Sequence, residues 1–367
     1  MHCFSLTALL LAGAARGIVG ASFPAHSWAT LPVFLHTSDE SRCVWSASDL
    51  AVASRFPAVT VEKWQGCRLQ GPTQETCSLA TAAALRALRP NVSVFIWYDS
   101  LRIYANKTLN PDIIDLSDQS CVRNAHTPFL ETHRAYLLPN ASGLPALESY
   151  IHAHVYDHRS PTVRDYWKDA CLALLTPSGA ARMDGCGADA SQQRGSYILG
   201  LDPAVAEAWT AAHVQAVAAA SAAVAALGGV VLGKVPAQLG VSTNGILQEG
   251  CNGSNATVSA LRAASALAAA SGTRLLYECH ADSASEASMA AFLVGAGEDH
   301  YWGTGPWVTP AGGLGGAWLP QFELPLGAPL GEAAYDAASA TWTRAFASGT
   351  AVTFNAATGA GSIKWAA

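Results

Sequence analysis

Short apolar runs alternate with amphipathic segments along most of the chain. Strands are predicted at 31–36, 58–64, 92–98, 152–156, 181–188, 229–235, 273–277, 299–302 and 350–354, with 362–365 pairing onto the last. Helices are predicted at 47–56, 77–88, 160–175, 203–227, 256–270, 283–296 and 331–347. Single helices between strands imply parallel pairing through right-handed crossovers. We therefore expect an α/β protein, and a strand count near eight favours a closed (β/α)8 TIM-type barrel over an open sheet.

The segment from 100 to 144 breaks this alternation. It is rich in polar residues and proline, and we expect it to form long loops over the C-terminal face of the barrel strands. The chain has no G-x-G-x-x-G after its first strand, no P-loop and no C-x-x-C. These absences disfavour nucleotide-binding open sheets and redox or zinc-ribbon chemistry, and we expect no cofactor.

The N-terminus has the pattern of a signal peptide. An apolar stretch over 4–15 precedes the small residues Val19-Gly20-Ala21, which form a cleavage site before Ser22. We therefore expect a signal peptide over 1–21 and a single barrel domain over 22–367. The expected location is the secretory pathway or the extracellular space.

Cysteines and glycosylation sequons support this location. The chain has 9 cysteines, and those outside the signal peptide are Cys43, Cys67, Cys77, Cys121, Cys171, Cys186, Cys251 and Cys279. This even number suits an oxidising compartment, and the short loop between Cys67 and Cys77 favours a disulfide between these two. N-x-S/T sequons begin at Asn91, Asn106, Asn140, Asn252 and Asn255, which makes a glycoprotein the expectation.

The composition of the chain argues against some classes of binding partner. The formal net charge is -6 and no run of Lys or Arg occurs, which argues against nucleic acid and anionic membranes as partners. The uncharged stretch over 214–233 is mostly alanine and is interrupted by Gly228-Gly229, so it favours a helix followed by a buried strand. No stable membrane span is expected after removal of the signal peptide.

Acidic residues recur where predicted strands end, which in such barrels is the face that carries the active site. The strand-end acids are Asp39, Glu62, Asp99, Asp189, Glu278 and Glu298 or Asp299. Aromatic residues stand beside several of them: Trp64, Trp97, Tyr98, Tyr277, Tyr301, Trp302 and Trp307. Paired carboxylates ringed by aromatic rings are typical of enzymes that cleave glycosidic bonds, because one carboxyl group protonates the leaving oxygen while the other attacks the anomeric carbon or activates water.

Four short motifs carry a resemblance to known proteins. They are Asp184-Gly185-Cys186-Gly187-Ala188-Asp189 (D-G-x-x-x-D), Val61-Glu62-Lys63-Trp64, Val155-Tyr156-Asp157 with Pro161, Val163, Arg164 and Trp167, and the stretch from Pro325 to Pro329 with Arg344-Ala345-Phe346 and Gly349. The chain resembles the hypothetical glycosyl-hydrolase-like (β/α)8 barrel families over most of its length. The resemblance implies a barrel with hydrolase character acting on a carbohydrate. Cys186-Gly187-Ala188 is smaller than the bulky apolar filling usual at this place.

By this resemblance, Asp189 is the first candidate for nucleophile or base, and Asp184 supplies supporting hydrogen bonds inside the barrel. Glu278 is the candidate general acid, because a carboxyl group beside Tyr277 on an apolar strand should have a raised pKa. Glu62 and Asp99 would bind sugar hydroxyl groups. The substrate-binding set is Glu62, Trp64, Tyr98, Asp99, Asp184 and Trp302.

Two alternatives remain open. A hydrolase scaffold without a second carboxyl group near Asp189 would be a carbohydrate-binding barrel that does not catalyse. A metal-dependent hydrolase would use His152 and His154, which lie on one face of a predicted strand. This hypothesis requires a third side chain that binds the same metal ion as His152 and His154.

Overall fold

The computed structural model describes residues 23–99, 102–103, 133–150, 152–177, 179–234 and 243–366. The expected signal peptide over 1–21 and the sequon at Asn106 lie outside these residues.

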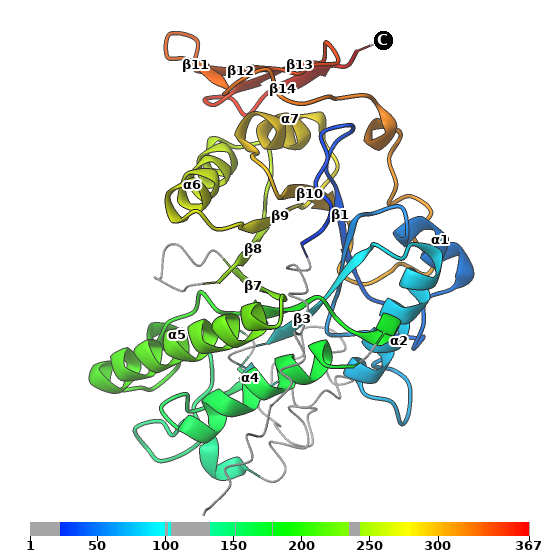
Figure 1. Ribbon diagram of the computed structural model, residues 1–367. Helices are drawn as coiled ribbons and strands as arrows, with labels where there is room; N and C mark the ends of the chain where they lie inside the picture. Colours follow the sequence, from blue (N-terminus) through cyan, green and yellow to red (C-terminus); the bar gives the residue numbers. More distant parts are fainter. Residues whose placement is uncertain are drawn as a thin grey trace, which may run out of the picture.

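Eight parallel strands form the central sheet in the order β1-β2-β3-β6-β7-β8-β9-β10. They are β1 (Phe34–Thr37), β2 (Ala58–Val61), β3 (Ser93–Asp99), β6 (Gly185–Asp189), β7 (Val230–Lys234), β8 (Gly245–Glu249), β9 (Leu276–Ala281) and β10 (His300–Thr304). A parallel bridge between Val33 and Trp302 brings the first and last strands together. The sheet is thus a nearly closed barrel (Figure 1), which confirms the predicted fold class.

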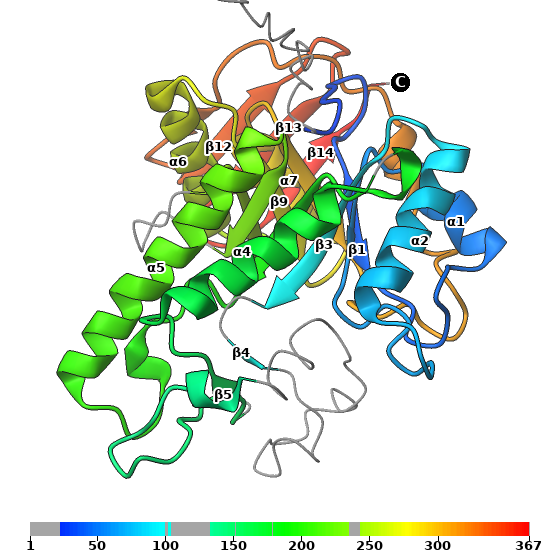
Figure 2. The same ribbon diagram turned by 60° about the horizontal axis from the view of Figure 1, so that its bottom comes forward.

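Helices connect these strands and cover the barrel. They are α1 (Ala47–Ala53), α2 (Gln74–Leu88), α4 (Pro161–Leu175), α5 (Pro203–Ala226), α6 (Asn255–Ser271) and α7 (Glu286–Gly295). Proline in the first turn starts α4 and α5, and Gly272 ends α6 in a left-handed conformation. The N-cap of α1 is Ser46, whose side chain accepts a hydrogen bond from the amide of Asp49. The two long helices α4 and α5 lie side by side in both views (Figures 1 and 2).

Large rings fill the barrel at alternate positions of the strands. Phe34, Phe95, Trp97, Leu232 and Leu247 belong to one buried cluster inside the barrel. A Cβ atom on Gly187 would overlap the indole of Trp97, and one on Gly185 would meet the backbone of Val230. The small residues of β6 therefore leave room for the rings of β3.

The loops between β3 and α4 carry a small two-stranded sheet, β4 (Arg102–Ile103) and β5 (His154–Val155). Figure 2 shows it beyond the C-terminal end of β3, the face on which long loops were predicted. Short 3-10 turns are η2 (Arg134–Tyr136), η3 (Gly179–Ala181), η4 (Gly195–Tyr197) and η6 (Pro320–Glu323).

The C-terminal residues form an antiparallel sheet instead of the helix predicted at 331–347. Its strands are β11 (Ala334–Asp336), β12 (Thr341–Ala345), β13 (Ala351–Asn355) and β14 (Gly361–Lys364). The predicted pairing of 362–365 with 350–354 is confirmed by β13 and β14. The sheet covers α7 on the outside of the barrel (Figure 1).

Three disulfides join described residues: Cys43–Cys77, Cys171–Cys186 and Cys251–Cys279. The predicted Cys67–Cys77 bond is wrong, because Cys77 lies on the buried side of α2 and bonds Cys43. No helix within the described part of the chain is both long and apolar enough to cross a membrane.

Candidate active site

The inward-facing residues become polar toward the C-terminal ends of the strands. His36 on β1, Asp189 on β6, Lys234 on β7 and Glu249 on β8 lie in this layer, and Glu62 follows β2 directly. Alternate residues of a strand face the same side, so these groups lie above the apolar filling of the barrel. The C-terminal ends of the strands form the face where barrel enzymes carry their active sites.

Asp189 is the centre of this cluster. Lys63 lies 3.0 Å from its Oδ2 and Lys234 lies 2.8 Å from its Oδ1. The amide of Ala190 also donates to Oδ1, at 2.8 Å, and Ala190 has a φ of 60°, which is unfavourable for a residue with a Cβ atom. Two ammonium groups and a backbone amide therefore favour the ionised form of this nearly buried carboxylate.

Glu62 shares Lys63 with Asp189. Its Oε1 lies 2.6 Å from Lys63 Nζ, and its Oε2 lies 2.8 Å from Nε2 of His36. Burial opposes ionisation of Glu62, but Lys63 and His36 together lower its pKa. Glu62 is thus a fixed negative charge beside Asp189.

Glu249 lies on the other side of Lys234, 2.9 Å from its Nζ. Burial lowers the pKa of Lys234, but Asp189 and Glu249 outweigh burial and raise it, so the lysine stays protonated. The side chain of Glu249 is 42% exposed, whereas that of Asp189 is 4% exposed. Glu249 is therefore the carboxylate of this cluster that solvent and a substrate can reach.

Sequence reasoning missed Lys63, Lys234 and Glu249 as site residues. Glu249 is the last residue of β8, and no strand was predicted at these residues. The turn-forming Asn244-Gly245 pair followed by the apolar Ile246-Leu247 was the signal for this strand.

Aromatic rings and imidazole rings line the same region. Trp307 stacks on His280 with 4.1 Å between ring centroids, and His36 meets Trp307 edge-on at 4.6 Å. Burial lowers the pKa of His280 to about 3, so this imidazole is neutral at neutral pH. Lys234 lies 5.9 Å above the ring of Trp97. The walls of the site are thus flat rings, and its centre is charged.

Glu278 lies inside the barrel and is fully buried. The hydroxyl of Thr60 is 2.9 Å from both of its carboxyl oxygens. Burial raises the pKa of Glu278 to about 8, although the Thr60 hydrogen bond opposes this change. The side chain is thus a neutral acid at neutral pH, and His280 lies two residues closer to the end of β9.

The other predicted residues are distributed over the whole barrel. Asp99 is the Cα partner of Asp189 across β3 and β6, and Trp64 lies 4.8 Å from the ammonium of Lys63. Tyr98 and Trp302 belong to the core between barrel and helices, where Tyr98 bonds Glu75 and Trp302 packs on Phe322.

Asp184 and Asp299 lie at the opposite ends of their strands from Asp189. Asp184 precedes β6, accepts a 2.8 Å hydrogen bond from the amide of Val94 and pairs with Arg86. Asp299 precedes β10 and binds Arg274. Asp184 thus makes its bonds at the N-terminal end of β6, at the other end of the strand from Asp189, and its predicted role in substrate binding stays a prediction.

His154 lies on β5 of the small sheet, where it pairs with Ile103 of β4, and His152 precedes this strand. Among the residues that the structure describes, no three His, Cys, Asp or Glu side chains converge to hold a metal ion. The third ligand that the metal reading requires is thus not found in this part of the chain.

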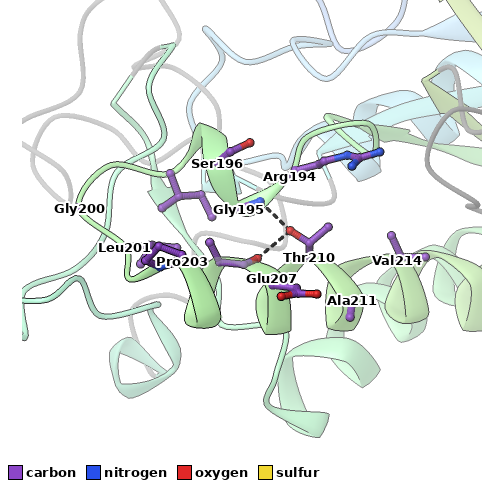
Figure 3. A pocket seen from close by; sticks show the side chains of 12 residues that line it. Arg194, Gly195, Ser196, Gly200, Leu201, Pro203, Glu207, Thr210, Ala211 and Val214 are labelled. Atoms are coloured by element: carbon purple, nitrogen blue, oxygen red, sulfur yellow. Dashed lines mark hydrogen bonds between the residues drawn. The ribbon is translucent and has the colours of Figure 1, made fainter.

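A separate hollow of about 690 Å³ lies between η4 and the start of α5 (Figure 3). The hydroxyl of Thr210 joins the two elements by accepting from the amide of Gly195 and donating to the carbonyl of Ala206. Glu207 is the one acid among its described lining residues. The hollow therefore lacks the paired carboxylates found at Asp189.

A model of the "Hypothetical glycosyl hydrolase family 15" matches residues 86–350. The chain belongs to this family. Membership in hypothetical glycosyl hydrolase family 15 confirms the resemblance and supports glycoside hydrolysis as the activity class. The matched region contains Asp189, Lys234, Glu249 and Glu278, but not Glu62 or Lys63.

One solved structure gives a likeness of fold, and a second match is weaker. The noncanonic maltogenic α-amylase AmyB from Thermotoga neapolitana is 9% identical, with 89% of this chain and 86% of that chain covered at a TM-score of 0.52. The cyclic α-maltosyl-(1→6)-maltose hydrolase from Arthrobacter globiformis is 13% identical, with 89% and 85% covered at a TM-score of 0.42. No curated protein matches the chain. At such identities the likeness to AmyB concerns the barrel fold alone.

Proposed function

We propose that this member of hypothetical glycosyl hydrolase family 15 is a secreted glycoside hydrolase that cleaves an oligosaccharide or polysaccharide. Asp189 acts as the nucleophile and Glu249 as the general acid. The observation that carries the proposal is Lys234, whose ammonium binds one oxygen of each carboxylate.

The shared lysine brings the two carboxylates close enough for a retaining mechanism. Both oxygens lie within 3 Å of Lys234 Nζ, so they are within about 6 Å of each other. Retaining enzymes hold their carboxyl groups ~5–5.5 Å apart, whereas inverting enzymes leave ~6.5–9.5 Å for a water molecule. In this mechanism Asp189 bonds the anomeric carbon while Glu249 gives a proton to the leaving oxygen.

Exposure and charge divide the roles. A nucleophile must be ionised, which the two lysines beside Asp189 favour. A general acid must reach the leaving group and carry a proton: the exposed side chain of Glu249 can reach it, whereas the ion pair with Lys234 opposes the protonated form of Glu249. The acid role predicted for Glu278 stays a competing proposal: its raised pKa favours it, and its full burial opposes it.

The binding-only alternative supposes that no second carboxyl group lies near Asp189. Glu62 and Glu249 each share a lysine with Asp189, so the described residues favour catalysis. Location in an oxidising compartment is supported by the three disulfides between described residues.

The test is a glycan panel followed by kinetics of Asp189→Asn, Glu249→Gln and Glu278→Gln, with the exposed Glu332→Gln as matched control. We expect Asp189→Asn to lose nearly all turnover. Glu249→Gln should lose about 10²–10⁴-fold on natural glycans but much less on aryl glycosides, whose leaving groups need no proton. Azide should restore turnover of Asp189→Gly with formation of a glycosyl azide.

The acid assignment fails if Glu278→Gln, and not Glu249→Gln, shows this dependence on the leaving group. Full activity of Asp189→Asn would reject the mechanism as a whole.

A further inference from the structure

Two N-glycosylation sequons adjoin each other at the start of α6, and their asparagines differ in bonding. The side-chain amide of Asn252 makes two hydrogen bonds to Asp282. Its Nδ2 donates to Oδ2 of Asp282 at 2.5 Å, and its Oδ1 accepts from the amide of Asp282 at 3.0 Å. A sugar on Asn252 would leave its Nδ2 a single N–H and would have to fit directly beside Asp282.

Asn255 is exposed and is the first residue of α6. Its Oδ1 accepts a hydrogen bond from the indole Nε1 of Trp342 at 3.2 Å. Its Nδ2 has no hydrogen-bond partner among the described residues. The nitrogen that would carry a sugar is thus available, while the oxygen is already fixed by a tryptophan.

An aromatic pair lies directly beside Asn255. The rings of Tyr335 and Trp342 are 4.7 Å apart between centroids and inclined by 39°. Arg262, two turns along α6 from Asn255, lies 5.0 Å from the centroid of Trp342. Tyr335 is 48% exposed, although it belongs to a pair of large apolar rings. Tyr335 is thus exposed beside the half-buried Trp342, and flat apolar faces of this kind suit the faces of sugars.

We propose that Asn255 carries an N-linked glycan and that the first sugars of this glycan pack on Tyr335 and Trp342. The reaction needs a lipid pyrophosphate-linked oligosaccharide as donor. Nδ2 of Asn255 bonds C1 of the first sugar as the bond from C1 to the pyrophosphate oxygen breaks. The amide loses one proton, and the lipid pyrophosphate leaves.

This inference rests on the secretory location in the proposed function and adds a structural role to the glycan. The glycan joins α6 to the strands β11 and β12, which carry Tyr335 and Trp342. The Trp342–Asn255 hydrogen bond remains intact in the glycosylated form, because only Nδ2 reacts.

The first experiment maps site occupancy on the full chain secreted from a eukaryotic host. Glycopeptides are treated with peptide N-glycosidase in ¹⁸O water, which labels each occupied asparagine as aspartate. We expect label at Asn255 and none at Asn252, retained label at Asn255 in Asn252→Gln, and no label within this pair in Asn255→Gln. An unlabelled Asn255 overturns the inference.

The second experiment tests the contact with the rings. Removal of the glycans should lower the Tm of the wild-type protein by roughly 1–3 °C, and Tyr335→Ala should lose this difference. Tyr197→Ala, which removes another exposed tyrosine, should keep it. An equal fall in the wild-type protein and Tyr335→Ala overturns the contact.

Glycosidase activity is measured on the same preparations. An active protein with an unoccupied Asn255 contradicts only this inference, whereas an occupied but inactive protein contradicts only the proposed catalysis.

Discussion

Glu278 is a carboxyl group that the fold keeps neutral. Its Cα partners on the two neighbouring strands are Leu247 and Tyr301, and its bonding partner is the hydroxyl of Thr60, which carries no charge. Burial without a cation favours the protonated form, which is why its pKa rises whereas that of Glu62, beside Lys63, falls. At neutral pH, Glu278 is thus neutral, whereas Glu62 in the same barrel is negatively charged.

This charge state makes stability depend on pH. The folded pKa of about 8 is above the unfolded value of 4.5, so the folded state binds the extra proton between these values. The stabilising effect of that proton is complete below pH 4.5 and is lost as the pH rises to 8. We expect Glu278→Gln to gain stability over the wild type progressively across this window, by a few kcal/mol at its upper end. Urea unfolding at several pH values measures it, and a difference that does not change with pH would contradict it.

Among single residues, the position of Asp189 at the end of a buried strand could be predicted, because the D-G-x-x-x-D pattern ends there. Lys63 and Lys234 could not, because lysines usually end strands on the surface, and only the closed barrel turns both toward Asp189. Glu278 was identified as an acid with a raised pKa, but its depth in the barrel depends on the register of β9 against β8 and β10. Side-chain depth is a tertiary property that sequence spacing does not contain.

At the scale of elements, one disulfide fixes the end of β8. Glu249 is followed by Gly250, with a φ of 66°, and by Cys251, which bonds Cys279 of β9. The amide of Cys251 also donates to the carbonyl of His280 at 2.8 Å. The chain therefore turns sharply after Glu249 and is held to the neighbouring strand two residues later.

Removal of this disulfide should affect catalysis as well as stability. We expect Cys251→Ser/Cys279→Ser to lower kcat at least about tenfold, because Glu249 loses its fixed position. Cys43→Ser/Cys77→Ser is the matched control, because its disulfide closes a loop of 34 residues against 28. Both double variants should lose about 2–4 kcal/mol of stability. Equal kcat in the two variants, measured where both are folded, would argue against a positioning role.

Elements with strong local signals were predicted well, and those decided by tertiary contacts were not. The helices predicted at 160–175 and 203–227 are α4 and α5, and each has a proline in its first turn. The alanine-rich stretch at 331–347 has high helix propensity, yet it forms β11 and β12 because alternate residues of β12 pack inward on α7. Asp336 forms the turn between them by accepting from Ala338 and Ser339.

At the scale of the whole molecule, the C-terminal sheet and the barrel share α7. All residues of α7 from Ser288 to Gly295 are buried, so the helix is apolar all round. The sheet binds both of its ends. Glu286 in the first turn accepts from the amide of Ile363 at 2.7 Å, and Arg344 donates to the carbonyls of Leu293 and Ala296 at the last turn.

This shared helix predicts that barrel and sheet unfold together. Phe354 is fully buried within the core that contains α7, whereas its neighbour Thr353 is on the exposed face of β13. We expect Phe354→Ala to lose about 3–5 kcal/mol and Thr353→Ala to stay within about 0.5 kcal/mol of the wild type. Both variants should unfold in one transition by calorimetry, and glycosidase activity should disappear at the same temperature. If the sheet of Phe354→Ala unfolded at a lower temperature while activity remained, contacts with the barrel alone would be enough to keep α7 folded. α7 follows β9 directly, and β9 carries Glu278 and His280. A single transition would therefore mean that residues of the C-terminal sheet, far from the site, contribute to the stability of this strand.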